Sequence, residues 1–198
     1  MKEIISWGNL KSSGTNKNKK QIVLIHSSRE KNEYLTSLKN RFDGKYDKIP
    51  NYLIDKQGNI VELIKPEESS KIFNDKVIDN NVIVICLENL GWLEKEPLKK
   101  HYINWIGNIY KGKVYEKQWR DYIFWDPYTE EQIDSTIFLC NKLTEKFEIE
   151  KKFVGHNTKI NGVEKFYGIA CRSNYFTEYT DLNPSFNFEY FLKKFENE

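Results

Sequence analysis

The stretch Gln21-Ile22-Val23-Leu24-Ile25-His26 decides the fold of this 198-residue chain. A run of apolar, largely β-branched residues is typical of a strand buried on both faces, as in the middle of a parallel sheet. A second run of this kind, Val82-Ile83-Val84-Ile85-Cys86-Leu87, follows later in the chain. The two runs predict an α/β fold built on a central sheet.

Turn and helix signals complete the outline. A hairpin is expected to turn at residues 55–58, where Gly58 can adopt a positive φ. A helix is expected from Glu130 to Phe147, with Thr129 and Gln132 forming a capping box, and a last helix carries apolar residues from Phe188 to Phe195. We therefore expect a single domain with a central mixed β-sheet flanked by helices, in which residues 1–20 form an N-terminal arm and residues 21–198 the domain. The basic run from Lys11 to Lys20 is interpreted as a solvated part of this arm.

Residues 90–128 stand out as an aromatic-rich insert of irregular structure. They contain four of the five tryptophans with tyrosines between them, namely Trp92, Trp105, Trp119, Trp125, Tyr102, Tyr110, Tyr115, Tyr122 and Tyr128. Aromatic rings stack on sugars, so the insert could wall a glycan groove. A small satellite core under a long loop explains the same residues. His101, in this insert, is interpreted as a surface or structural histidine.

Two of the three histidines follow apolar runs and are candidates for a shared metal. His26 ends the first run, and His156 ends Phe153-Val154-Gly155-His156. With a carboxylate, for which Asp181 is the candidate, two imidazoles would form a three-residue zinc site with an open fourth position. Spacing alone does not decide this, because the histidines are far apart in sequence and no compact metal motif is present.

The order of several motifs adds a family resemblance. They are Ile25-His26-Ser27-Ser28, Tyr52-Leu53-Ile54-Asp55 with Gly58 and Ile60, Val82 to Asn89, Gly155-His156, and Thr180-Asp181 before Pro184-Ser185-Phe186. This order resembles the zinc-dependent N-acetylmuramoyl-L-alanine amidases, a superfamily that includes peptidoglycan-recognition proteins and phage amidase-type lysozymes. The resemblance implies that His26, His156 and Asp181 bind Zn²⁺. It also implies that a zinc-bound water attacks the amide between the muramic acid lactyl group and L-alanine of peptidoglycan.

The usual helper residues of that family are replaced. Its members commonly carry a Glu where this chain has Cys86, or a Tyr where it has Pro50, and many carry a Lys where it has Tyr179. Glu88, two residues beyond Cys86 on the same strand face, and Arg172 are the candidate catalytic substitutes. The structural interpretation of Glu88 is a solvated or salt-bridged carboxylate at the end of a strand. Trp92 and Asn174 are predicted to contact the substrate.

Composition limits the remaining possibilities. The net charge of +2 comes from 31 basic and 29 acidic residues, which argues against a nucleic-acid partner. Three cysteines without motif spacing indicate a reducing compartment, and Cys86 within an apolar run is more typical of a packed thiol than of a nucleophile. No signal peptide or membrane helix is expected. We expect a monomer, cytoplasmic as synthesised, that would reach a cell wall by lysis or a leaderless secretion route.

Three functional interpretations remain open. The first is a zinc amidase acting on peptidoglycan or muropeptides, and the second is a catalytically weak or inactive peptidoglycan-binding module of the same fold. Retention of the three possible ligands favours the enzyme, whereas loss of the usual acid and Lys favours the binding module. A plain α/β domain without a metal is the third.

Overall fold

The main sheet sets the architecture of the chain, for which a computed structural model describes residues 3–7 and 14–197. Within this part of the chain the sheet has the strand order β1-β4-β3-β5-β2-β11. The strands are Ile4–Ser6 (β1), Gln21–His26 (β2), Tyr52–Ile54 (β3), Ile60–Glu62 (β4), Val82–Leu87 (β5) and Gly168–Cys171 (β11). Neighbours run parallel except for β3 and β4, the predicted hairpin. The predicted α/β fold with a mixed central sheet is confirmed.

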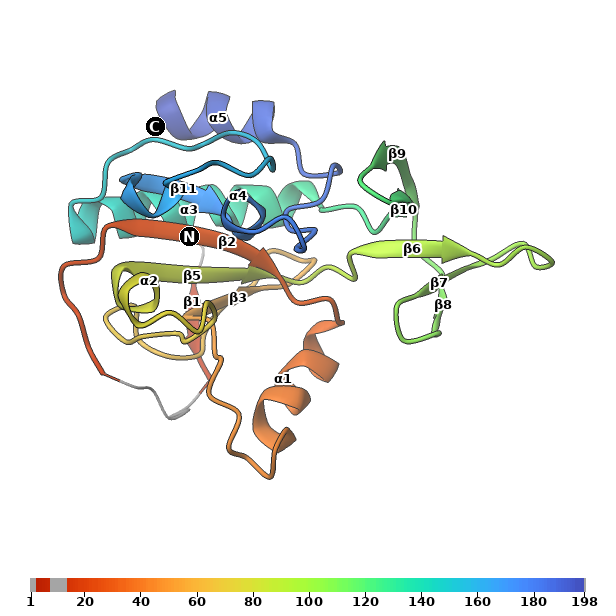
Figure 1. The fold of residues 1–198 in the computed structure, drawn as a ribbon, viewed down its shortest axis with the longest axis horizontal. Helices are drawn as coiled ribbons and strands as arrows, with labels where there is room; N and C mark the ends of the chain where they lie inside the picture. The colour runs from red at the N-terminus through yellow and green to blue at the C-terminus, as the bar shows by residue number, and fades with distance from the viewer. Residues whose placement is uncertain (1–2, 8–13, 198) are drawn as a thin grey trace.

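Helices cover both faces of this sheet (Figure 1). They are α1 (Lys31–Asn40), α2 (Lys76–Asn81), α3 (Glu130–Phe147), α4 (Arg172–Tyr175) and α5 (Phe188–Asn197), with a single 3₁₀ turn at Val163–Lys165. One core lies between the sheet and α3 and α5, and the other contains residues of α1 and α4. Every residue of β2 and β5 is buried, because these strands lie inside the sheet and between the two helical layers.

Helix α3 begins and ends as the sequence predicts. The Thr129 hydroxyl accepts a hydrogen bond from the Gln132 backbone N–H, and the Gln132 side chain accepts one from the Thr129 N–H. The Gln132 amide also donates to the backbone carbonyl of Glu88, at 2.8 Å. The cap therefore fixes α3 to the end of β5.

The N-terminal segment is described for residues 3–7 and 14–20, and the part of the expected solvated run at residues 11–13 lies outside the described residues. Residues Ile4–Ser6 pair in parallel with β4 and form one edge of the main sheet. Lys19 is buried, and its ammonium group donates to the backbone carbonyls of Glu68 and Asn80. The aliphatic part of a lysine side chain packs well in a protein interior, and carbonyl oxygens that accept hydrogen bonds from its ammonium group stabilise the buried charge.

The insert forms a second sheet instead of an irregular loop. Its antiparallel strands lie in the order β8-β7-β6-β10-β9 and project to one side of the main sheet (Figure 1). Their bounds are Trp92–Lys95 (β6), Tyr102–Asn104 (β7), Ile109–Tyr110 (β8), Tyr115–Trp119 (β9) and Tyr122–Trp125 (β10). Aromatic rings pack across these strands, as in the stacked pair Trp92 and Tyr122 with centroids 4.7 Å apart. Such cross-strand pairs stabilise a sheet that has little other core.

The segment that ends in His156 is not a strand. Phe153 makes an isolated bridge to Ile169, and Gly155 has a φ of +76°, which ends the extended conformation. The position beside β2 is taken by β11, whose residues Gly168 to Cys171 are in register with Gln21 to Leu24. As a result, Arg172 and the residues after it are brought close to His26.

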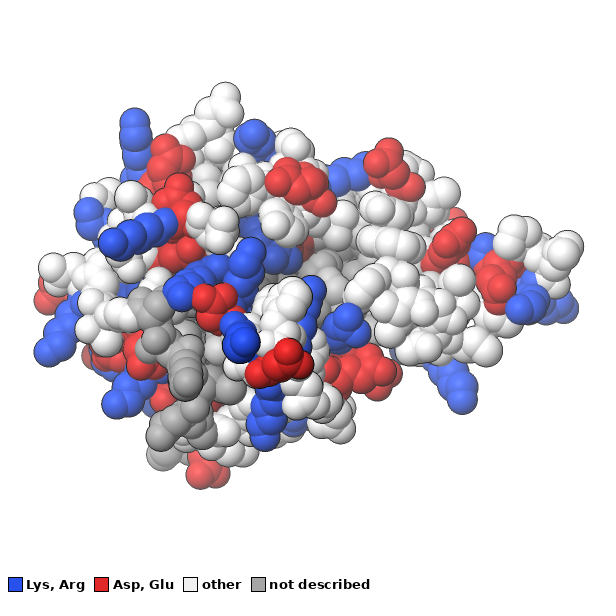
Figure 2. All heavy atoms as spheres, turned by 60° about the horizontal axis from the view of Figure 1, so that its bottom comes forward, with Lys and Arg blue, Asp and Glu red and all other residues white. Residues whose placement is uncertain are grey.

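The surface and the helices agree with the composition. Figure 2 shows basic and acidic side chains interspersed over the face that it draws, without a large area of one sign. In the described part of the chain, none of the helices combines the length and the apolar character needed to cross a bilayer.

Candidate functional site

His26 is held rigidly at the end of the central strand β2. Its side chain is buried, and its Nδ1 atom lies 3.4 Å from the hydroxyl of Tyr128. Burial lowers the pKa of His26 to about 4, although the nearby Asp181 carboxylate partly opposes this effect. The imidazole is therefore neutral near pH 7, with its ring nitrogens available for hydrogen bonding or ligation.

Asp181 lies beside His26, as the sequence predicts. Its Oδ2 atom accepts a hydrogen bond from the His26 backbone N–H at 3.3 Å, and its side chain is fully buried. The Arg172 guanidinium also binds both oxygens of Asp181, with Nε 3.2 Å from Oδ1 and Nη2 2.8 Å from Oδ2. Arg172 follows β11 directly, so the parallel pairing of β11 with β2 places this ion pair at the end of the strands.

His156 does not join this pair. Its side chain is exposed, and its Nδ1 atom accepts a hydrogen bond from the Thr158 backbone N–H at 3.2 Å. Among the residues that the structure describes, no three His, Cys, Asp or Glu side chains form a group that could hold a metal ion. The structure therefore brings the Asp181 carboxylate to the His26 backbone and leaves His156 exposed, while the metal-binding roles of the three residues stay predictions.

These residues, as they are arranged, do not fit the zinc ion that the resemblance implies. A zinc site of this kind needs free lone pairs on two imidazoles and one carboxylate. Here the guanidinium of Arg172 binds both oxygens of Asp181, and one imidazole faces solvent.

Glu88 and Asn174 have structural contacts that their predicted roles did not anticipate. The Glu88 carboxylate accepts hydrogen bonds from the backbone N–H groups of Lys31 and Lys56, and so joins the start of α1 to the hairpin turn. The fully buried Asn174 amide donates to the carbonyls of His156 and Thr158. Asn174 therefore holds the loop after Gly155 against α4 and does not face a cavity.

The cysteine at the family's acidic position is an inert thiol. Cys86 is fully buried, and burial raises the pKa of its thiol to about 12. A protonated, packed thiol is a poor nucleophile, in agreement with the interpretation from the sequence.

A cavity of about 300 Å³ opens beside His26. Its lining residues are His26, Ser28, Leu90, Gly91, Trp92, Trp105 and Thr180. Trp92, predicted to contact substrate, thus lies in the wall of this cavity. Gly91 is required there, because it has a φ of +80° and an added Cβ would lie 3.2 Å from Cε1 of His26. The cavity combines aromatic walls with one buried polar group, as is common for ligand sites.

The insert is attached on two sides of this cavity. The indole N–H of Trp105 donates to the Ser28 carbonyl at 2.6 Å. On the other side, the Arg120 guanidinium donates to the carbonyls of Thr177 and Tyr179, in the loop that leads to Asp181. Sequence analysis did not identify Arg120, because its partners are backbone atoms far along the chain.

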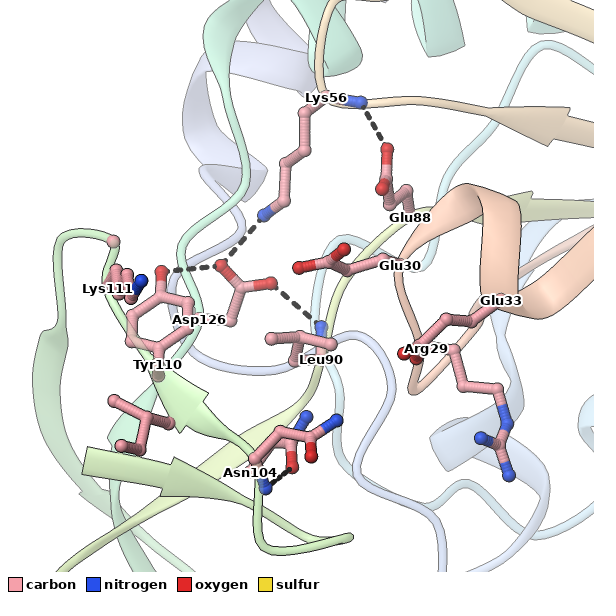
Figure 3. Close-up of a pocket in the computed structure, with 13 residues that line it drawn as sticks. Arg29, Glu30, Glu33, Lys56, Glu88, Leu90, Asn104, Tyr110, Lys111 and Asp126 are labelled. Carbon is pink, nitrogen blue, oxygen red and sulfur yellow. Dashed lines mark hydrogen bonds and ion pairs between the residues drawn. The ribbon is translucent and has the colours of Figure 1, made fainter.

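A larger, more polar cavity of about 540 Å³ lies next to the first, and Leu90 lines both. Figure 3 shows Glu30 and Glu33 on one side and Asp126, Lys111 and Tyr110 on the other. The Asp126 carboxylate accepts hydrogen bonds from the Lys56 ammonium, the Tyr110 hydroxyl and the Leu90 backbone N–H, at 2.9, 2.9 and 2.8 Å (Figure 3). Asp126 was not predicted either, since a single Asp after an aromatic strand carries no motif.

Comparisons with known proteins agree with the resemblance. A family model described as N-acetylmuramoyl-L-alanine amidase matches residues 16–166, a range that includes His26 and His156 and ends before Asp181. The fold is similar to that of the N-acetylmuramoyl-L-alanine amidase LysC from Clostridium intestinale URNW, with 14% identity, a TM-score of 0.58 and coverage of 99% of both chains. The endolysine N-acetylmuramoyl-L-alanine amidase LysCS from the same organism gives the same identity and TM-score, covering 99% of this chain and 97% of that one. No protein of curated function matches the sequence significantly.

Proposed function

Because this chain belongs to the N-acetylmuramoyl-L-alanine amidase family, we propose that it binds muropeptides and hydrolyses the amide between the lactyl group and L-alanine of the stem peptide. The observation that carries this proposal is the buried pair of His26 and Asp181 at the end of the central strands. A neutral imidazole and a fixed carboxylate beside a cavity are typical of a site that performs polar chemistry.

The two neighbouring cavities suit the two parts of a muropeptide. The smaller one has aromatic walls from Trp92 and Trp105, against which a sugar ring can pack. The larger one carries both carboxylates and ammonium groups, among them Glu30, Glu33 and Lys111, which suits the ionic groups of a stem peptide. This arrangement supports placing the scissile amide where the cavities meet, next to His26.

Zinc is the cofactor that the family resemblance implies for this reaction. Of the three ligands that the resemblance implies, His26 and Asp181 are neighbours, whereas Arg172 binds Asp181 and His156 is exposed. We therefore propose hydrolysis at this site and test its metal requirement separately, by measuring zinc in the purified chain and activity before and after chelation.

The test of hydrolysis is incubation of the purified chain with muropeptides, followed by mass spectrometry of the products. We expect peptides with a free L-alanine amino terminus, and we expect Asp181→Ala and His26→Ala to abolish their release. Lys193→Ala, on α5, is the control variant and should cleave as the wild type does. Release by wild type that does not exceed that by Asp181→Ala would refute the hydrolytic proposal.

The second candidate is a peptidoglycan-binding module without efficient hydrolysis. Two specific observations favour it, since the Arg172 guanidinium binds both oxygens of Asp181 and the buried thiol of Cys86 stands at the family's acidic position. For this candidate we expect wild type to bind muropeptides in calorimetry without product release, and Trp92→Ala to weaken binding. Absence of both binding and cleavage would exclude both candidates.

A further inference from the structure

The cation that neutralises Asp181 in this structure is a side chain of the protein itself. Arg172 makes a two-point contact with the carboxylate, and the side chain of Asp181 is fully buried while that of Arg172 is 16% exposed. Two-point guanidinium–carboxylate pairs are among the strongest side-chain hydrogen bonds, and burial removes the water that would weaken them. Three donors therefore bind the Asp181 carboxylate, namely Arg172 on both oxygens and the His26 N–H on Oδ2.

Other contacts hold the guanidinium in this position. Its central carbon lies 4.1 Å from the ring centroid of Tyr179, a distance typical of a cation–π contact. The carbonyl of Tyr179 is in turn bound by Arg120 of the insert. Arg172 is also the first residue of α4, directly after β11, so its backbone is fixed by the main sheet.

We infer that Arg172 is a built-in cation that excludes a metal ion from Asp181. A divalent cation and the guanidinium compete for these two oxygens, because both need carboxylate lone pairs and because the two positive charges repel one another in a buried site. Metal binding at Asp181 and the ion pair with Arg172 are thus competing states of one site. The inference rests on the proposed function only in assigning the family's metal position to His26 and Asp181.

Zinc titration tests this inference without any activity measurement. Isothermal calorimetry with zinc chloride is carried out on the wild type and on Arg172→Ala, with bound zinc counted after dialysis. Removing the positive charge that lies 2.8 Å from the Asp181 carboxylate is expected to tighten zinc binding about tenfold or more. Arg41→Ala removes the same charge from an exposed site at the C-terminal end of α1 and is expected to bind zinc as the wild type does.

Two further variants test whether a gain in zinc affinity depends on Asp181 and whether it is seen in a folded protein. Arg172→Gln keeps an amide donor for the buried Asp181 and removes the charge, so it should fold and also gain zinc affinity even where Arg172→Ala unfolds. Adding Asp181→Asn to Arg172→Gln should return zinc binding to the wild-type level. The inference is overturned by tight stoichiometric zinc in the wild type, by no gain in folded Arg172→Gln, or by a gain that survives Asp181→Asn. Failure to cleave muropeptides would overturn the hydrolytic proposal and leave this result unaffected.

Discussion

At the scale of single residues, the site depends on close contacts between the two histidine-bearing segments and residues distant in sequence. Gly91 packs against the imidazole of His26 with a φ of +80°, which permits the wall of the smaller cavity to touch the ring. The side-chain NH₂ group of Asn174 likewise donates to two carbonyls of the loop that carries His156, while its Oδ1 accepts from the Cys171 N–H. Gly91 contacts His26 and Asn174 contacts the loop of His156, although each pair is far apart in the sequence.

Gly91→Ala should lower the free energy of unfolding and disturb His26. A residue with a Cβ costs about 1–2 kcal/mol at this φ, and the new methyl group would also press on Cε1 of the imidazole. Gly107→Ala is a matched control, because Gly107 has a φ of +82° with no atom within 4 Å of an added Cβ. Urea unfolding should show a larger loss for Gly91→Ala than for Gly107→Ala. Equal losses would contradict the contact with His26.

Lys19 makes the stability of the protein depend on pH. Burial lowers the pKa of Lys19 to about 8, and the carboxylates of Asp79 and Glu67 oppose this only in part. Between about pH 8 and 10.5 the unfolded chain binds more protons at this residue than the folded chain, so its contribution to stability rises with pH. The stability of the wild type relative to Lys19→Met should therefore increase from pH 8 to pH 10 in urea unfolding. A difference that stays constant or falls would contradict the burial of this charge.

At the scale of elements, the start of α3 joins the hairpin turn and the end of β5. The Thr129 hydroxyl donates to the Lys56 carbonyl at 2.7 Å and accepts from the Gln132 N–H at 3.2 Å. Through Lys56 this cap also touches the residues that surround Asp126 and the larger cavity. A helix cap thus helps to position the site.

Thr129→Ala should destabilise the fold by about 1–2 kcal/mol, because it removes the helix cap and a contact with the hairpin turn. Thr129→Ser keeps the hydroxyl and should lose less than half of that amount. Thermal and urea unfolding of the two variants provide the measurement. If Thr129→Ser were as unstable as Thr129→Ala, the methyl group and not the hydroxyl would be responsible.

At the scale of the whole molecule, two sheets meet around the site. The insert reaches the main sheet through Trp105 at Ser28, through Arg120 at the loop before Asp181, and through Asp126 at Lys56. These contacts are polar, and they lie on several sides of the two cavities. The insert therefore forms part of the site in addition to packing its own small aromatic core.

Asp126→Ala should loosen the insert and reduce stability by about 3 kcal/mol. It leaves the Leu90 N–H without its partner and removes the negative charge beside the Lys56 ammonium, which keeps its hydrogen bond to the Pro127 carbonyl. Tyr110→Phe removes one hydrogen bond to the same carboxylate and should cost about 1 kcal/mol. Hydrogen exchange should be faster across β6 to β10 in Asp126→Ala than in Tyr110→Phe. Unchanged exchange in Asp126→Ala would show that the insert is held by other contacts.

The sequence by itself determined what local rules control. Apolar runs predicted β2 and β5, the turn at Gly58 predicted the hairpin, and the capping box at Thr129 predicted α3, since each depends on residues close together in the chain. The order of motifs also predicted that His26 and Asp181 belong to one site, and in the structure the Asp181 carboxylate accepts a hydrogen bond from the His26 backbone N–H.

Only the tertiary structure decided which distant residues meet. The insert looks irregular in sequence because its aromatic residues lack a clear strand period, yet antiparallel pairing makes it a sheet. The sequence also could not show that β11, rather than the segment before His156, takes the place beside β2. That choice brings Arg172 onto Asp181 and leaves His156 exposed, because backbone pairing between strands far apart in the chain fixes which side chains reach the end of the sheet.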